Sequence, residues 1–116
     1  MKYIIIEKAE KPKCKYYYVD FDKTLAHHET GWGIEKIGEP IPSMLARVKR
    51  LLAQGKGVKI FTARAQYGAK VKRDIQDWLE KHGLPRLEVT NVKKDDIAEI
   101  WDDKAKQVKP NTGKFK

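Results

Sequence analysis

Short apolar runs and longer amphipathic stretches alternate along the chain. The short runs are rich in Tyr, Val, Ile and Phe, a composition typical of strands that are buried on both faces of a sheet. They predict four strands, over residues 16–21, 58–61, 87–90 and 97–101. Polar residues lie at or just beyond the end of each run, so polar side chains are expected at the strand ends.

Two longer stretches carry apolar residues at helical spacing. The first has an apolar stripe over residues 44–52, with Ser43 as its predicted N-cap and glycines after its last turn. The second runs over residues 69–81. Strands that alternate with helices predict a parallel sheet with right-handed crossovers. We therefore expect an α/β fold, a Rossmann-like three-layer α/β/α arrangement with a mostly parallel sheet.

Three segments lie outside this pattern. Residues 4–6 predict a short strand that forms a hairpin with residues 16–21. Residues 27–39 contain Trp32 and several glycines and predict a small flap, the one segment suited to a local lid. The connections are too short for a separate cap domain, so we expect a rather open site. A Lys-rich tail begins at about residue 104.

Length and composition indicate a single globular domain. The 116 residues suit one domain spanning residues 1–116, and 41% are hydrophobic. The apolar runs are too short to cross a bilayer, and no signal-peptide pattern opens the chain, so we expect a cytoplasmic protein without a membrane partner. A single cysteine, Cys14, fits a reducing compartment.

The chain is strongly basic. Its formal net charge is +9 and its pI is near 9.6. This charge indicates an anionic partner, either a phosphorylated substrate or nucleic acid, and does not choose between them. Much of the excess lies in the tail, where the lysines do not alternate with stacking aromatic residues. A solvated basic tail is the simpler interpretation of that segment.

The strand over residues 16–21 carries the most informative chemistry. Asp20 and Asp22 lie at its carboxyl end, where open parallel sheets place their ligands. Carboxylates beside an apolar core are costly unless a cation or a hydrogen-bond network compensates them. The pair therefore predicts a divalent metal, Mg²⁺.

Other strand ends add polar groups that converge on the same edge. They are Thr62, Lys93, and the acidic pair Asp102 and Asp103. Taken singly these residues are weak signals, since a lysine is usually solvated and an acidic pair can begin a helix. The adjacent His27 and His28 point apart on a strand, so we expect a substrate contact or a plain loop there rather than a metal site.

In order and spacing, these residues resemble the four motifs of the haloacid dehalogenase-like phosphohydrolase superfamily: Asp-x-Asp-x-Thr, then Thr, then Lys, then an acidic pair. The resemblance spans residues 16–103. It is greatest to small uncapped phosphatase-type proteins of bacteria and phages, on residues 61–64 and 101–105. It implies a Mg²⁺-dependent phosphomonoesterase that acts through an aspartyl-phosphate, located in the host cytoplasm if the chain is phage-encoded.

The resemblance also implies a role for each motif residue. Asp20 is expected to be the nucleophile, and Asp22 the general acid and then the base. Thr62 and Lys93 are expected to hold phosphate oxygens, with Lys94 as the alternative lysine. Mg²⁺ is expected to bind Asp20, Asp22 through its main-chain carbonyl, and Asp102 or Asp103.

The substrate and the oligomeric state stay open at this level. Lys23 stands where the family often has Gly, which weakens any inference about the substrate. Uncapped members often act on large substrates, so nucleotide or polynucleotide phosphate ends join small phosphates as expected substrates. A basic nucleic-acid-binding protein on the same scaffold without turnover is the alternative, and an interaction module is a third interpretation.

Overall fold

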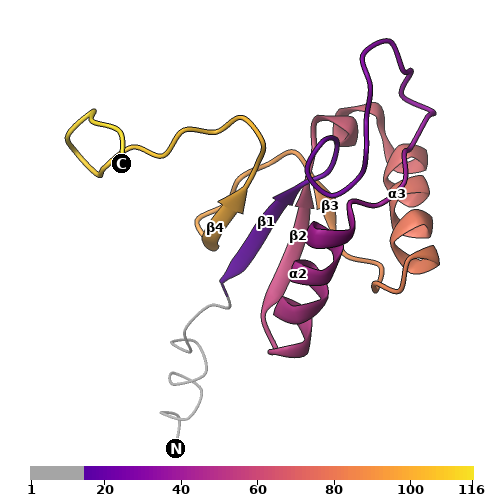
Figure 1. The fold of residues 1–116 in the computed structure, drawn as a ribbon, viewed down its shortest axis with the longest axis horizontal. Coiled ribbons are helices and arrows are strands. Elements are labelled where there is room, and N and C mark those ends of the chain that lie inside the picture. The colour runs from indigo at the N-terminus through magenta and orange to yellow at the C-terminus, as the bar shows by residue number, and fades with distance from the viewer. Residues whose placement is uncertain (1–14) are drawn as a thin grey trace, which may run out of the picture.

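The computed structural model describes residues 15–116 (Figure 1). Their regular elements, in chain order, are β1 (Tyr16–Asp20), α2 (Pro42–Ala53), β2 (Gly57–Phe61), the short 3₁₀ helix η1 (Ala63–Tyr67), α3 (Ala69–Lys81), β3 (Val89–Thr90) and β4 (Ile97–Trp101). The predicted strand over residues 4–6, its hairpin and Cys14 lie outside the described residues.

The four strands form one parallel sheet in the order β3-β2-β1-β4. On one side of β1, Asp20 pairs with Phe61 of β2, and on the other side Val19 pairs with Trp101 of β4. Parallel pairing in this register brings the carboxyl ends of β1, β2 and β4 to the same edge of the sheet. The expected α/β fold with a parallel sheet is confirmed.

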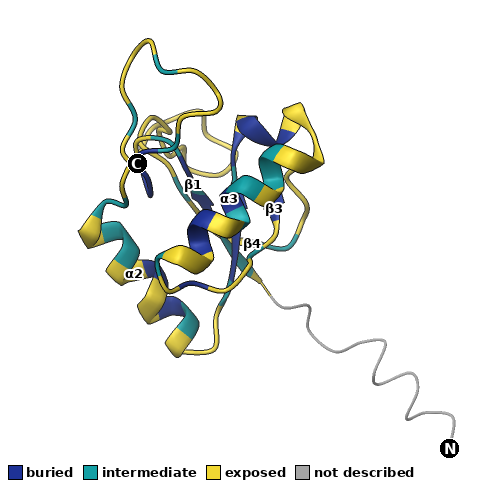
Figure 2. Cartoon of the chain, turned by 90° about the vertical axis from the view of Figure 1, so that its right-hand side faces the viewer, coloured by how far each residue is buried: buried dark blue, intermediate teal, exposed yellow. Residues whose placement is uncertain are grey.

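Both α-helices cover the same face of this sheet (Figure 2). The crossovers β1-α2-β2 and β2-α3-β3 step in the same direction, and right-handed crossovers in one direction place their helices on one face. The chain returns from β3 to β4 through residues 91–96 without a helix. Residues 15–116 thus supply the sheet and one helical layer, and the third expected layer is not among them. They contain no separate cap domain.

The main core lies between the sheet and the two helices. Its buried residues come from β1, β2 and the helices, and include Val19, Ile60, Val48, Ile75 and Leu79. The rings of Phe21 and Trp78 meet edge to face with centroids 5.0 Å apart. The Trp78 indole N–H donates to the main-chain oxygen of Gly38 at 2.9 Å, so the core reaches the base of the flap.

The opposite face of the sheet holds a buried polar cluster. The hydroxyl of Tyr18 donates to Asp96 at 2.6 Å, and the ammonium of Lys59 donates to the other oxygen of that carboxylate at 3.0 Å. These two donors hold the pKa of Asp96 below its ordinary value. Because Asp96 directly precedes β4, this cluster anchors β4 beside β1 and positions the residues that follow it.

The bounds of one helix agree with the prediction from the sequence, and the start of the other does not. α3 spans the predicted residues, but the prediction that Ser43 caps the first helix is wrong. Ile41 is the N-cap, without a side-chain capping bond, and Pro42 lies in the first turn. Proline suits that turn because its φ is already helical and the N–H it lacks has no partner there. Among the described residues, no helix has the length and apolar content needed to span a membrane.

The C-terminal residues from about 104 extend away from the sheet as an arm (Figure 1). The arm ends in a small hairpin in which Val108 forms a bridge with Phe115. The ammonium of Lys106 lies 4.8 Å from the centroid of the Phe115 ring. This arm is the segment that the sequence identifies as a Lys-rich tail.

Candidate active site

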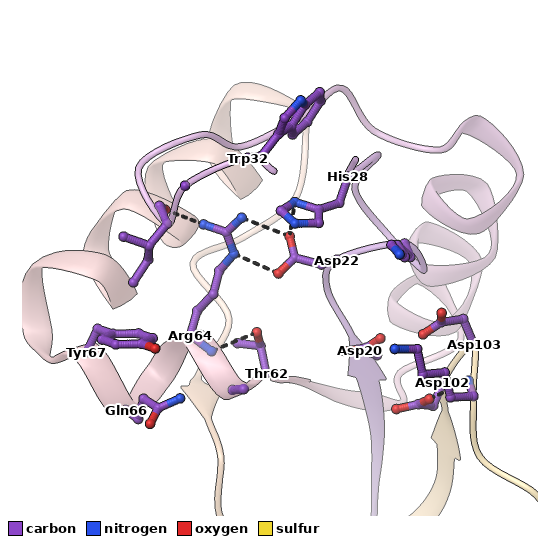
Figure 3. A pocket seen from close by; sticks show the side chains of 15 residues that line it. Asp20, Asp22, His28, Trp32, Thr62, Arg64, Gln66, Tyr67, Asp102 and Asp103 are labelled. Atoms are coloured by element: carbon purple, nitrogen blue, oxygen red, sulfur yellow. Dashed lines mark hydrogen bonds and ion pairs between the residues drawn. The ribbon is translucent and has the colours of Figure 1, made fainter. Parts of the chain in front are cut away.

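Three carboxylates meet where β1 and β4 end (Figure 3). Asp20 is the last residue of β1, and Asp102 and Asp103 directly follow β4, which pairs with β1. One oxygen of each carboxylate lies within 4.8 Å of the other two. Carboxylate oxygens in such a group suit Mg²⁺, which binds one or two carboxylates and keeps several waters. The structure therefore brings three of the predicted metal ligands together.

Asp20 is the least exposed of the three. Burial, followed by the charge of Asp102, raises its pKa to about 7, although a hydrogen bond from the Thr24 hydroxyl at 3.1 Å acts in the opposite direction. A nearby cation favours the ionised form of such a group. A cation beside these carboxylates would therefore favour the ionised form that the expected nucleophile needs.

The chain turns sharply after β1 and separates the two acids of the first motif. The main-chain N–H groups of Leu25 and Ala26 both donate to the oxygen of Phe21 at 2.9 Å. Lys23 has a φ of 69°, in the left-handed region that glycine adopts without strain. This conformation gives a physical reason why glycine suits the position, and Lys23 itself lines the cavity described below.

Asp22 points toward Arg64, away from the three-carboxylate group (Figure 3). The guanidinium of Arg64 binds both carboxylate oxygens, through Nε at 2.7 Å and through Nη2 at 3.0 Å. The side chain of Asp22 is therefore the one predicted site carboxylate that the structure does not bring to the group. Arg64 was not predicted as a site residue. Its place two residues after Thr62, near the end of the strand that pairs with the strand leading to Asp20 and Asp22, could have indicated a cation beside these acids.

Thr62 lies at the carboxyl end of β2 and is buried. It is the N-cap of η1, and its Oγ1 accepts a hydrogen bond from the main-chain N–H of Arg64 at 3.2 Å. A hydroxyl that accepts one bond can still donate its own hydrogen. Thr62 and Asp20 line the same cavity, so this hydrogen can serve an anion bound beside Asp20.

The structure does not bring Lys93 to the carboxylates. Lys93 and its neighbour Lys94 are exposed in the loop between β3 and β4, and neither lines the two cavities that adjoin Asp20. Asn91, at the start of this loop, lines the smaller of these cavities together with Asp20 and Thr62. Asp96 anchors the end of this loop on the opposite face of the sheet. The spacing of residues along the sequence does not predict this anchor.

A cavity of about 500 Å³ adjoins the carboxylates. Asp20 and Thr62 form part of its lining, and the flap contributes Trp32 and Ile34. Residues of η1 complete the wall, among them Tyr67, which is largely exposed. The segment that the sequence identifies as a candidate lid therefore borders the candidate site, and the contribution of η1 was not predicted.

The two adjacent histidines diverge. His28 lines the cavity, and its Nδ1 lies 3.5 Å from an oxygen of Asp22 while its ring stacks edge to face on Trp32. That Nδ1 is buried without a hydrogen-bond partner among the described residues. His27 is exposed and pairs with Glu29 at 3.1 Å.

Comparison with known proteins supports the fold. No protein-family model and no curated protein matches the chain. Among solved structures, a conserved protein coded by a locus from Bacteroides thetaiotaomicron is similar, with a TM-score of 0.62 over 80% of this chain and 78% of that chain. The two sequences are 20% identical, and a likeness at this level shows a shared fold alone. The functional argument therefore depends on the site itself.

Proposed function

We propose that the protein is a Mg²⁺-dependent phosphomonoesterase of the haloacid dehalogenase-like type. The observation that supports this most is the meeting of Asp20, Asp102 and Asp103 within 4.8 Å at the carboxyl edge of a parallel sheet. The donors are all hard oxygens, so the residues fit Mg²⁺. When bound, the ion supplies positive charge that offsets the carboxylates and the phosphate.

In this proposal Asp20 is the nucleophile. An oxygen of Asp20 attacks phosphorus in line, the bond from phosphorus to the leaving oxygen breaks, and Asp22 gives that oxygen a proton. The Thr62 hydroxyl donates to a phosphoryl oxygen, where charge accumulates. A water molecule then gives a proton to Asp22 and attacks phosphorus, which releases inorganic phosphate and restores Asp20.

Positive charge for the phosphate comes from more than one side. Lys23 and Lys104 line the cavity, so they are better placed than Lys93 to attract an anionic substrate in this conformation. The net charge of +9 is consistent with nucleotide or polynucleotide phosphate ends as substrates. The same charge and the exposed lysines of the C-terminal arm support the second candidate, nucleic-acid binding without turnover.

Phosphate release from p-nitrophenyl phosphate and from a panel of nucleotides and 3′-phosphorylated DNA, with Mg²⁺ and with a chelator, tests the proposal. We expect Mg²⁺-dependent turnover that Asp20→Asn lowers on the order of 10³-fold or more. Asp77→Asn is the matched control, since Asp77 is exposed on α3 and bonds Arg86. Turnover that survives in Asp20→Asn contradicts the proposal. Silence of the wild type on the whole panel, with DNA affinity that falls steeply with salt, favours the second candidate.

A further inference from the structure

Arg64 is a buried cation whose guanidinium makes four hydrogen bonds. Only 6% of the residue is exposed. Besides the two bonds to Asp22, its Nη1 donates to the main-chain oxygen of Ile34, and its Nη2 donates to that of Lys36 at 2.8 Å. Burying a guanidinium is costly unless such bonds compensate it, and the planar fork of arginine matches a carboxylate as lysine cannot.

These bonds tie the flap to the site. Within residues 15–116, the hydrogen bonds that join flap residues 29–36 to the rest of the molecule are the two that Arg64 donates. The other bonds of this stretch are local, from Trp32 to Glu29 and from Lys36 to Gly33. One side chain, which projects from η1, therefore makes the hydrogen bonds that hold the flap tip over the cavity, beside the ring contact of Trp32 with His28 and the ion pair of Glu29 with His27 (Figure 3).

The same side chain orients Asp22. A two-point contact fixes the plane of the carboxyl group as well as its position. The lone pairs of Asp22 that Arg64 does not use then have a fixed direction. The nearby His28 adds a second neighbour, with its Nδ1 at 3.5 Å from the carboxylate.

We propose that Arg64 is a positioning residue that holds the carboxyl group of Asp22 for proton transfer and, through the same guanidinium, holds the flap closed over the cavity. The part that concerns proton transfer rests on the proposed phosphatase function. The part that concerns the flap does not, since it follows from the contacts with Ile34 and Lys36.

A leaving-group series tests the first part. A nitrophenolate departs with little help from an acid, whereas the alkoxide of glycerol 2-phosphate needs a proton. We expect Arg64→Ala to lower kcat for the alkyl phosphate at least about tenfold more than for p-nitrophenyl phosphate, in parallel with Asp22→Asn. An equal loss on both substrates indicates a role in phosphate binding or folding only, and overturns the positioning of Asp22.

Limited trypsin digestion tests the second part without any turnover. Lys36 is exposed in the flap, so cleavage after it, followed by mass spectrometry, reports release of the flap tip. We expect Arg64→Ala to accelerate this cleavage by about tenfold or more over the wild type. Arg86→Ala is the matched control, because Arg86 makes two ion pairs with Asp77 and Glu80 on the surface, far in sequence from the flap.

Arg64→Lys keeps the test decisive if Arg64→Ala does not fold. It retains the buried charge but cannot make the fork or reach all four acceptors. We expect it to share the leaving-group effect and the faster cleavage at Lys36. Cleavage at the wild-type rate in a folded Arg64 variant overturns the flap contact, whatever the phosphatase assay shows.

Discussion

At the scale of the residue, Asp20 illustrates the cost of a carboxylate that lies beside an apolar core and a second acid. The position at the end of a central strand places it beside the core, and Asp102 brings a second negative charge to it. Both effects penalise the ionised form, which the proposed chemistry requires. Residues that serve a reaction often carry a stability cost of this kind.

This cost predicts a pH-dependent effect of Asp20→Asn. Burial raises the pKa of Asp20 to about 7 in the folded chain, whereas the pKa of an unfolded aspartate is about 3.9. Between these values the folded state holds the extra proton, so stability falls as the pH rises through this window. We expect the melting temperature of Asp20→Asn in a chelator to exceed that of the wild type at about pH 8, and the excess to shrink toward about pH 4.5.

Mg²⁺ provides the complementary measurement. Since an ion that binds the folded state stabilises it, Mg²⁺ should raise the melting temperature of the wild type at about pH 8 and have little effect on Asp20→Asn. Asp77→Asn should respond to Mg²⁺ like the wild type. An Asp20→Asn variant that melts below the wild type at the higher pH would contradict this account.

At the scale of the element, the flap depends on a close approach at its base. A Cβ atom at Gly38 would collide with the main-chain oxygen of His27, which cannot move without displacing the strand-like start of the flap. The N–H of His27 already donates to Glu39 at 2.7 Å, so the two sides of the flap base are held together. Glycine is needed here for space.

We therefore expect Gly38→Ala to destabilise the fold by about 1–3 kcal/mol, the usual cost of forcing atoms into occupied space. Gly33→Ala is the control, because the three atoms nearest to its added Cβ all belong to the carboxyl group of the flexible Glu35 side chain. Urea unfolding of the two variants and the wild type measures the difference. Equal stability of the two variants would show that the backbone at His27 can move to make room for the Cβ at position 38 at little cost.

At the scale of the whole molecule, the body and the C-terminal arm are distinct parts. The main-chain hydrogen bonds of residues 107–116 that the structure records join residues of the arm to each other, such as Lys109 to Lys114 and Lys116 to Gln107. Residues 107–116 contribute charge, since Lys109, Lys114 and Lys116 supply 3 of the 9 net positive charges. The body contains the core and the carboxylates.

Removal of residues 107–116 should therefore lower the positive charge of the protein without changing the proposed active site. We expect the melting temperature and the proposed phosphatase activity to change little. Any affinity for DNA should fall, with a salt slope that is shallower by up to about 0.9 for each lysine that contacts a phosphate. Fluorescence anisotropy with labelled DNA over a range of salt concentrations measures the slope. A large drop in melting temperature would show that the arm supports the body.

Much of the fold follows from local sequence, and the reason is visible in particular elements. α3 forms where its apolar residues recur at helical spacing, and the strands form where β-prone residues run together. Boundaries that depend on neighbours were less predictable. Pro42 rather than Ser43 begins α2, and β3 is limited to Val89 and Thr90, which pair in register with Ile60 and Phe61 of β2.

The sequence by itself determined the α/β pattern and the residues at the ends of β1, β2 and β4, because both depend on near neighbours in the chain. Only the tertiary structure decided which of those residues meet. Pairing of β4 with β1 brings Asp102 and Asp103 to Asp20, while the sharp turn at Lys23 directs Asp22 to Arg64. Anchoring of Asp96 on the far face leaves Lys93 in solvent. These outcomes depend on contacts between residues distant in sequence, which periodicity and spacing do not encode.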